Sequence, residues 1–486
     1  MISMTNAARD NADRPKPVRP APRAVAQPQT VWLNCIREPR LGEASTRTAQ
    51  LGVQFGIPLF AEPTVLVGPV RITLGPGRVV LLCGPSGSGK TSALEQLRTK
   101  CPEACSLNDI QFPHHAAVID GVAPAAELGD AIRTLTACGL GDANLWPRRF
   151  DELSEGEKFR ARLARGVAMQ AAEPPPSAEA APSVLLCDEF CSLLDRRAAR
   201  ALAHALRKLV TRQRLCVVAA STNADLITDL QPDTVLSLQG QGRWRCQEQP
   251  PPVPRPVTFL RRLHVQPGTK ADYDEFAAMH YRAAEELGFV DKVFVLRDEA
   301  DGELLGIVVY AHSPLELSLR NQATGGAFCR HPRRVNRRLR ILRRLVIRPD
   351  VRGCGLGQYL VRRTLPRVGT EFVECLAAMG EFNPVFEKAG MRRIGRCPVS
   401  PEQHAAIDAL RALDADVSSR EFPIRVCRDR RVRQIVLEAV DHWYAATTGG
   451  GRRRVDRQPP HVLAQTFRGL AGLRPVYYLW QRPGSR

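Results

Sequence analysis

The sequence contains no run of eighteen apolar residues, and its first thirty residues contain no apolar stretch of the kind found in secretion signals. We therefore expect neither a membrane-spanning helix nor export, and we predict a cytoplasmic protein. Its 14 cysteines are scattered, mostly in apolar segments, which favours reduced core residues over a disulfide framework. Cys101, Cys105, His114 and His115 lack the spacing of common zinc sites, so we expect no structural zinc.

Acidic residues are scarce in the second half of the chain. Residues 1–250 hold 29 Lys and Arg against 25 Asp and Glu, whereas residues 251–486 hold 40 against 25. This excess favours an anionic partner such as nucleic acid or cofactor phosphates, although charge that only maintains solubility gives the same pattern.

Arginine supplies most of this excess, in the run Arg330–Arg340, at Arg343 and Arg344, and in Arg452–Arg454. Arginine is better suited than lysine to forked contacts with phosphate. Few aromatic residues interleave with the run, so stacking on single-stranded bases is not expected. The alternative interpretation is a solvated strand face with contacts to cofactor phosphates.

The length of 486 residues predicts about three domains. Residues 1–29 lack periodicity and are expected to form a disordered tail. Residues 172–183 predict a surface insertion, and consecutive prolines make 249–256 an interdomain linker. The chain is expected to end in an aromatic strand at Val476–Trp480. The predicted division is 1–29, 30–248, 249–256, 257–399 and 400–486.

The first expected domain carries a phosphate-binding loop, which follows the apolar strand Val79–Cys83 and precedes a helix predicted from Thr91 to Lys100. The amides at the helix start and Lys90 would bind nucleotide phosphates, and the Thr91 hydroxyl would ligate Mg²⁺. The residues predicted to bind ATP here are Gly84, Pro85, Ser86, Gly87, Ser88, Gly89, Lys90, Thr91 and Ser92.

Two acids end a second apolar strand, Ser183–Cys187. After a phosphate loop, Asp188 is predicted to hold Mg²⁺ and Glu189 to polarise the attacking water. The alternative is an ordinary helix cap or surface turn.

Between these motifs, Ser154 and Glu157 form a predicted capping box at the start of a helix. Together with Ser192–Asp195 as a D-loop, this segment resembles the signature motif of ABC-type ATPases, and the resemblance covers residues 60–245. It implies that Ser154 and Gly156 contact ATP held by a second subunit, in a homodimer. Asn223 stands where the family has a switch histidine and is the second predicted catalytic residue beside Glu189.

Several positions depart from that family pattern. Glu155 replaces the usual glycine of the signature, Phe190 replaces proline, and Asn223 cannot take up charge, so hydrolysis is expected to be slow. Gln111 is a weak match to the Q-loop. The 64 residues from Lys90 to Ser154 are fewer than we expect in a transporter subunit.

The second expected domain alternates strands and helices. We predict strands at Val257–Leu263 and Arg338–Ile347, a helix over Tyr273–Glu286, and a hairpin at Asp301-Gly302. A glycine-rich segment, Arg352–Gly357, then opens a helix and would let the backbone approach a pyrophosphate.

With Asn383–Met391, this segment resembles the acetyl-CoA loop and following helix of the GNAT superfamily of N-acetyltransferases, over about 140 residues. Phe386 stands where the family has a tyrosine that protonates the leaving thiolate, so water, Cys375 or another group would have to serve. Glu371, Glu374 and Glu381 are the nearest candidate bases. The acetyl-CoA-binding residues implied by the resemblance are Val346, Ile347, Arg352, Gly353, Cys354, Gly355, Leu356, Gly357, Asn383 and Phe386.

The combined prediction is an α/β protein in which a P-loop ATPase domain of ABC type precedes an α+β GNAT-like acetyltransferase domain and a basic C-terminal segment. Its cofactors would be ATP, Mg²⁺ and acetyl-CoA. We expect a soluble homodimer without a membrane partner, coupling ATP hydrolysis to acetylation of RNA or of a nucleic-acid-associated protein. The alternatives are an ATP-switched binding protein with a degenerate GNAT domain and the ATPase subunit of a transporter.

Overall fold

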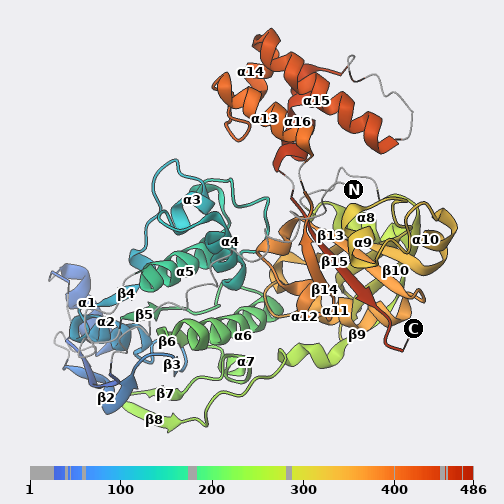
Figure 1. The fold of residues 1–486 in the computed structure, drawn as a ribbon. Helices are drawn as coiled ribbons and strands as arrows, with labels where there is room; N and C mark the ends of the chain where they lie inside the picture. Colours follow the sequence, from blue (N-terminus) through green and yellow to red (C-terminus); the bar gives the residue numbers. More distant parts are fainter. Residues whose placement is uncertain are drawn as a thin grey trace. The chain divides into compact units, whose positions relative to one another are not determined.

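The computed structural model describes residues 27–38, 42–43, 45–56, 62–172, 183–280, 287–398, 400–448, 455, 458–472 and 474–484. The chain forms two compact units, the first reaching Arg261 and including Pro349–Cys354, and the second comprising Arg262–Arg348 and Gly355–Arg486 (Figure 1). One division thus falls between Cys354 and Gly355, inside the predicted acetyl-CoA loop. Residues 1–26 of the expected tail, 173–182 of the expected insertion and Arg452–Arg454 lie outside the described residues.

A six-stranded sheet forms the centre of the first unit, in the order β4-β5-β6-β3-β7-β8. All neighbouring pairs are parallel except β7 and β8. The strands are β3 (Val79–Cys83), β4 (Ala104–Ser106), β5 (Val184–Cys187), β6 (Cys216–Ser221), β7 (Thr234–Gly240) and β8 (Arg243–Glu248).

Both faces of this sheet are covered. Alternate residues of β3 face opposite sides, so Leu81 packs with helices α3 to α6. Leu82 packs with α2 and with the strands β1 (Gln29–Arg37) and β2 (Thr64–Leu74). Burial on both sides explains why β3 and β5 are continuous apolar runs. The helices are α2 (Lys90–Lys100), α3 (Val118–Val122), α4 (Leu128–Ala137), α5 (Glu155–Ala172), α6 (Arg196–Gln213) and α7 (Ile227–Leu230).

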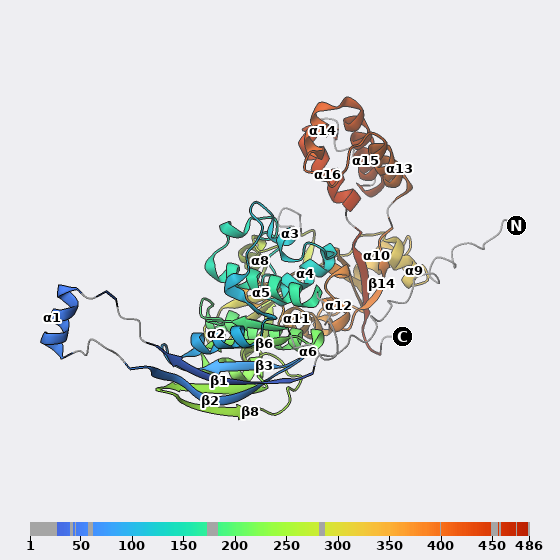
Figure 2. The same ribbon diagram turned by 90° about the vertical axis from the view of Figure 1, so that its left-hand side faces the viewer.

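A long antiparallel hairpin joins β1 (Gln29–Arg37) to β2 (Thr64–Leu74), and Figure 2 shows it beside β8. Helix α1 (Thr46–Phe55) lies between these two strands in the sequence and has no buried residue. The hairpin therefore covers the sheet, whereas α1 contributes nothing to its core.

The second unit contains a seven-stranded sheet in the order β14-β15-β13-β12-β11-β10-β9. Among its neighbouring pairs, β12 and β13 are parallel and the others are antiparallel. The strands are β9 (Leu263–Gly268), β10 (Val290–Asp298), β11 (Leu304–Ala311), β12 (Leu339–Ile347), β13 (Phe372–Ala377), β14 (Arg392–Arg396) and β15 (Val476–Gln481).

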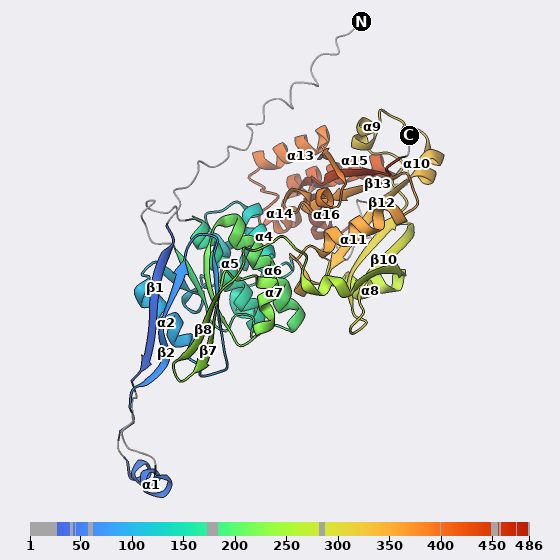
Figure 3. The ribbon, with the colours of Figure 1, turned by 90° about the horizontal axis from the view of Figure 1, so that it is seen from below.

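Helices lie on both faces of this sheet as well. Helix α8 packs its Tyr273 and Phe276 against the face that carries Val309, whereas Tyr310 of the same strand bonds to Thr364 of α11 on the other face (Figure 3). The helices of this part are α8 (Lys270–Ala277), α9 (Ser318–Ala323), α10 (Pro332–Arg338), α11 (Leu356–Thr364) and α12 (Val385–Lys388).

Two predictions made for elements of the second expected domain, residues 257–399, are corrected. Residues Thr258–Arg262 form a 3₁₀ turn, and the first strand begins only at Leu263, because the Asp229 carboxylate accepts hydrogen bonds from the Thr258 amide and hydroxyl (2.8 and 2.6 Å). The helix expected over Tyr273–Glu286 begins at Lys270, where Thr269 forms a capping box, and ends at Ala277. Residues 281–286 lie outside the described residues.

The expected C-terminal segment 400–486 is divided between two structures. Helices α13 (Pro401–Ala412), α14 (Phe422–Arg428), α15 (Arg430–Thr448) and α16 (Pro460–Gly472) enclose a core of their own. The aromatic strand β15 then inserts between β13 and β14, and five of its six residues are buried. A boundary at residue 400 therefore does not separate the sheet from the C-terminal segment. None of the described helices combines the length and the apolar character that a bilayer crossing requires.

Candidate functional site

The phosphate-loop motif forms the turn between β3 and α2, and its glycines have conformations that other residues adopt only at a cost. Gly89 is the N-cap of α2 with φ +96°. At Gly84 a Cβ atom would lie 2.3 Å from the Leu238 carbonyl oxygen. Because no side chain caps α2, the first amides of the helix are available to an anion.

Lys90 and Ser88 complete the loop. The Lys90 ammonium donates to the carbonyl oxygens of Gly84 and Pro85, both at 2.8 Å, and so lies over the loop. Ser88 is buried, and its hydroxyl has no partner among the described residues. The loop thus presents a cation, free amides and an unsatisfied hydroxyl, a donor set that fits a polyphosphate.

The predicted magnesium ligands meet at one edge of the sheet. The Thr91 hydroxyl donates to the Asp188 carboxylate at 2.8 Å, across 97 residues of sequence. They meet because β3 and β5 both run parallel to β6, which brings their carboxyl ends to the same edge. Among the described residues, no group of three or more His, Cys, Asp and Glu side chains is arranged so that it could hold a metal ion. A hydroxyl and one carboxylate beside phosphates suit Mg²⁺, which needs few protein ligands.

Glu189 lies next to this pair in an unusual backbone conformation. Its φ is +47°, a region in which residues other than glycine are strained, and its side chain is exposed. Its amide donates to the Asp188 carboxylate at 2.9 Å, and its own carboxylate accepts from the Ser192 hydroxyl at 3.5 Å. The turn thus holds the second acid toward solvent beside the predicted magnesium ligand.

Asn223 is linked to the same turn through a serine that sequence reasoning did not single out. The Asn223 amide donates to the Ser221 hydroxyl at 3.1 Å, and that hydroxyl donates to the Phe190 carbonyl at 3.1 Å. Ser221 is the last residue of β6, two residues before the predicted switch position. This position at the strand end is the signal that could have identified it.

The predicted signature segment is exposed at the start of α5. Both the amide and the hydroxyl of Ser154 donate to the Glu157 carboxylate (2.9 and 2.8 Å). A Cβ at Gly156 would lie 3.1 Å from Leu194 and 3.2 Å from the Leu193 carbonyl, so the segment packs on the predicted D-loop. Asp195 of that loop caps α6.

Glu155, the extra acid of the signature, is turned to solvent. Its carboxylate pairs with Lys158 at 2.8 Å, and this hydrogen bond lowers the pKa of Glu155. The positive charge of Lys158 offsets the negative charge of Glu155, which would otherwise repel a bound phosphate. Gln111, the weak Q-loop candidate, is also exposed.

In the second unit, the predicted acetyl-CoA loop leads into α11. Gly355 is the N-cap of this helix with φ +99°, and no side chain caps it. A Cβ at Gly357 would lie 3.1 Å from Val385, so glycine lets α11 start close to α12. Asn383 precedes α12 and is exposed. Arg352, Gly353 and Cys354 belong to the first unit by the division of the chain.

The strand that precedes this loop pairs with two neighbours over different lengths. Parallel pairing of β12 with β13 runs from Leu339 and Phe372 to Leu342 and Cys375, whereas antiparallel pairing with β11 continues to Ile347.

Phe386 is buried beside a tyrosine that sequence reasoning missed. Its ring centroid lies 5.4 Å from that of Tyr478 on β15, whose hydroxyl donates to the Gly380 carbonyl at 3.2 Å. Burial raises the pKa of Tyr478 to about 12 and also raises the pKa of the Cys375 thiol. Both groups therefore stay protonated at neutral pH.

The three candidate bases all have arginine partners. Glu374 is fully buried and accepts from Arg320 through two nitrogens (2.9 and 2.8 Å) and from the Tyr477 hydroxyl at 2.8 Å. Glu371 pairs with Arg338 at 2.5 Å. Glu381 pairs with Arg393 and Arg396. Each of these three carboxylates is therefore engaged by at least one arginine.

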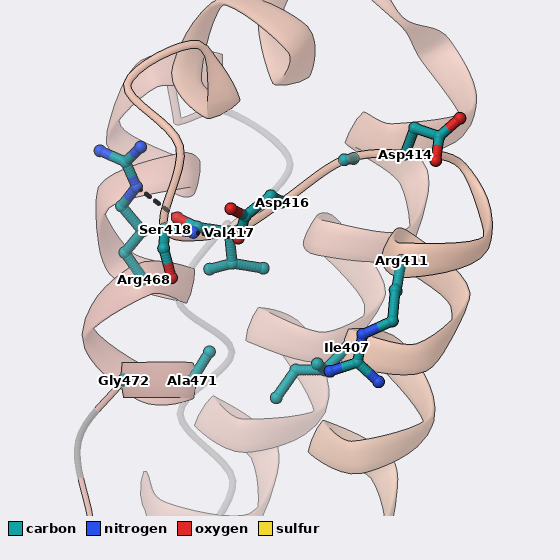
Figure 4. Close-up of a pocket in the computed structure, with 10 residues that line it drawn as sticks. Ile407, Arg411, Asp414, Asp416, Val417, Ser418, Arg468, Ala471 and Gly472 are labelled. Atoms are coloured by element: carbon teal, nitrogen blue, oxygen red, sulfur yellow. Dashed lines mark hydrogen bonds between the residues drawn. The ribbon is translucent and has the colours of Figure 1, made fainter.

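A separate pocket lies among α13, α16 and the loop that follows α13 (Figure 4). Its volume is about 660 Å³, and Arg411 lines one side of it. Arg468 donates from Nε to the Val417 carbonyl at 2.8 Å and fastens the loop to α16. None of the predicted site residues lines this pocket.

Comparison with known proteins finds relatives for part of the chain, and no family model matches it. The lipoprotein-releasing system ATP-binding protein LolD 1 of Rhodopirellula baltica is 26% identical over 211 residues, 36% of this chain and 86% of that protein. The L-cystine transport system ATP-binding protein TcyN of Escherichia coli is 28% identical, over 43% of this chain and 95% of that protein. The aliphatic sulfonates import ATP-binding protein SsuB 2 of Nocardia farcinica is 31% identical, over 37% and 76% respectively.

Among solved structures, the dimeric bacterial ABC transporter cassette MJ0796 covers 45% of this chain and 98% of its own chain, at 16% identity and a TM-score of 0.33.

Proposed function

Since the chain belongs, over somewhat more than a third of its length, to the family of ABC-type ATPases, we propose that its first unit binds ATP with Mg²⁺ and hydrolyses it. The observation that carries this proposal is the convergence of Thr91 and Asp188 beside the phosphate loop. Bound Mg²⁺ would neutralise charge on the transferred phosphate. Glu189, held toward solvent next to Asp188, would orient the attacking water and accept its proton.

The proposed site needs a second copy of the chain. Ser154 and Gly156 lie at the start of α5, and Ser154 is exposed there, so it is available to a nucleotide bound by another protomer. Leu193 of the adjoining D-loop is 56% exposed, an apolar side chain that a dimer interface would cover. We therefore propose an ATP-dependent homodimer.

For the second unit we propose acetyl transfer from acetyl-CoA to RNA or to a nucleic-acid-associated protein. The support is the start of α11 after Gly355, which no side chain caps. The amides of this helix start would bind the pyrophosphate. Phe386 cannot donate a proton, so the protonated hydroxyl of Tyr478, whose ring packs on Phe386, would be the acid that protonates the leaving thiolate.

Replacing Lys90 by alanine is expected to weaken ATP binding by roughly 10- to 100-fold, because one charge-assisted contact to phosphate contributes about 1.5–3 kcal/mol. Isothermal titration calorimetry with ATP and Mg²⁺ measures the change. Lys100→Ala, at the other end of α2, is the matched control and should bind ATP like the wild type. If the wild type and Lys90→Ala bound ATP with equal affinity, the assignment of the phosphate loop as the nucleotide site would be wrong.

Replacing Gly355 by alanine is expected to weaken acetyl-CoA binding about tenfold, since a side chain at φ +99° costs on the order of 1–2 kcal/mol and shifts the start of α11. Calorimetry with acetyl-CoA tests this. Gly395→Ala, a position with open space around its Cβ and no positive φ, is the control. Absence of acetyl-CoA binding by the wild type would end the acetyltransferase proposal.

One observation favours a second candidate function, an ATP-switched binding protein. Phe386 lacks the proton that acetyl transfer needs, and Glu374 is occupied by Arg320. Incubation with labelled acetyl-CoA and cellular RNA and protein fractions separates the two functions, because a binding protein labels neither fraction. The relatives include ATP-binding proteins of transport systems, which also favours a transporter ATPase. Copurification with a membrane permease would support that role.

A further inference from the structure

The segment between β11 and β12, residues 312–338, carries α9 and α10 and is held by a buried arginine that the proposed reaction does not use. Arg320 of α9 is fully buried and bonds to Glu374 of β13. It also donates to the carbonyl oxygens of Pro314 (2.7 Å) and Leu315 (3.0 Å). These bonds fix the start of the segment to the centre of the sheet.

Helix α10 is held by one apolar face. Val335 is buried in a cluster with Phe328 and Leu339. Arg338 lies over the ring of Phe328 at 5.7 Å and pairs with Glu371. The inward side chains of α10 are thus all occupied, and the helix has a defined orientation.

The outward face of α10 consists of arginines without acidic partners. Arg333, Arg334 and Arg337 are exposed, and among the described residues none of them has a carboxylate partner. At 100° per residue they lie within one third of the helix circumference, opposite Val335. We call Arg333, Arg334 and Arg337 the arginine platform.

Charge in the surrounding segment does not offset the platform. Residues 312–338 hold six arginines and a single acidic residue, Glu316. The Glu316 carboxylate accepts from the Arg330 amide at 2.9 Å and from the Asn321 side chain at 3.0 Å. A solvated face would be expected to mix both signs of charge, whereas this one presents three like charges.

We propose that the arginine platform binds the phosphate backbone of double-stranded nucleic acid. The three platform arginines span about 6 Å along the helix axis, or about one charge per 3 Å, and a duplex presents one charge per ~3.4 Å of each strand, so the platform matches the density of phosphates. Helices α9 and α10 contain no aromatic residue on which single-stranded bases could stack. Double-stranded nucleic acid would then be the partner in the proposed function, and the biological role of the platform rests on that function.

The test is binding of fluorescent 20-base-pair RNA and DNA duplexes of one sequence to the full chain, measured by anisotropy at several salt concentrations without ATP or acetyl-CoA. The triple variant Arg333→Ala, Arg334→Ala, Arg337→Ala should bind at least tenfold more weakly at low salt. Its slope of log affinity against log salt should be smaller in magnitude by about 2 to 3, since each neutralised phosphate contributes about 0.9 in DNA. The RNA and DNA arms decide which duplex is bound.

The matched control removes three other exposed arginines of the second unit, Arg428, Arg430 and Arg431. This control has the same net charge as the platform variant and should keep the wild-type affinity and slope. Unchanged duplex binding by the platform variant, or an equal loss in the control, would overturn the proposal. So would displacement of the duplex by poly-glutamate at equal charge, which would indicate an acidic protein partner. The duplex-binding assay contains neither ATP nor acetyl-CoA. Its result is therefore independent of whether the chain binds ATP or acetyl-CoA in the calorimetric titrations.

Discussion

Replacing Glu189 by glutamine is expected to lower the rate of ATP turnover by 10²- to 10⁴-fold, the usual contribution of a positioned general base. Glutamine has nearly the same shape but cannot accept the proton of the attacking water. ATP binding should persist, because Lys90, Thr91 and Asp188 are unchanged. Steady-state phosphate release and ATP calorimetry on the same preparation measure both quantities, and sedimentation velocity with ATP should show the variant accumulating as a dimer.

Glu127→Gln is the matched control for this experiment. Glu127 is an exposed acid in the same unit, and its side chain makes no capping hydrogen bond at the start of α4. This control should hydrolyse ATP at the wild-type rate. A Glu189→Gln variant with wild-type turnover would show that Glu189 does not act as the base.

Replacing Glu374 by alanine is expected to destabilise the second unit by about 3–5 kcal/mol, because it leaves the buried guanidinium of Arg320 without its counter-charge. The same change removes the acceptor of the Tyr477 hydroxyl. Hydrogen exchange of β13 and β15 in the full chain, followed by mass spectrometry, should show protection reduced by about 10²- to 10⁴-fold.

Glu371→Ala is the control for the buried pair. Glu371 also pairs with an arginine, but Arg338 is 43% exposed, and such pairs contribute about 0–1 kcal/mol. Its loss should change exchange in β13 by less than about tenfold. If both variants lowered protection equally, burial of the Arg320–Glu374 pair would not be the source of the stability.

The first site could be predicted closely because its signals are local. The phosphate loop, its strand and its helix are consecutive in sequence, so Gly84 to Lys100 already encode the turn and the helix start. The contact of Thr91 with Asp188 followed from a general property of parallel sheets, in which strand ends share one edge. The exposure of Glu155 and its pairing with Lys158, three residues on, also follow local helix geometry.

The surroundings of the proposed acetyl-CoA site were predicted less completely, because the side chains that pack there come from distant segments. Tyr478 lies 92 residues after Phe386, and Arg320 lies 54 residues before Glu374. No spacing rule links such positions. The strand predicted at Val257–Leu263 is absent over its first residues for a related reason. Asp229, which is distant in sequence, accepts a hydrogen bond from the Thr258 amide.

The sequence alone predicts the features that depend on neighbouring residues. These are the phosphate loop, the acidic strand end, the helix start at Ser154, the glycine-rich turn before α11 and the surplus of arginine. The tertiary structure alone decided which distant side chains meet. It placed β15 inside the second sheet and paired Glu374 with Arg320. It also paired Arg338 and Arg340 with acids, whereas no carboxylate of the described residues pairs with the platform arginines. The physical reason is that burial and pairing of charge depend on chain segments that only the folded sheet brings together.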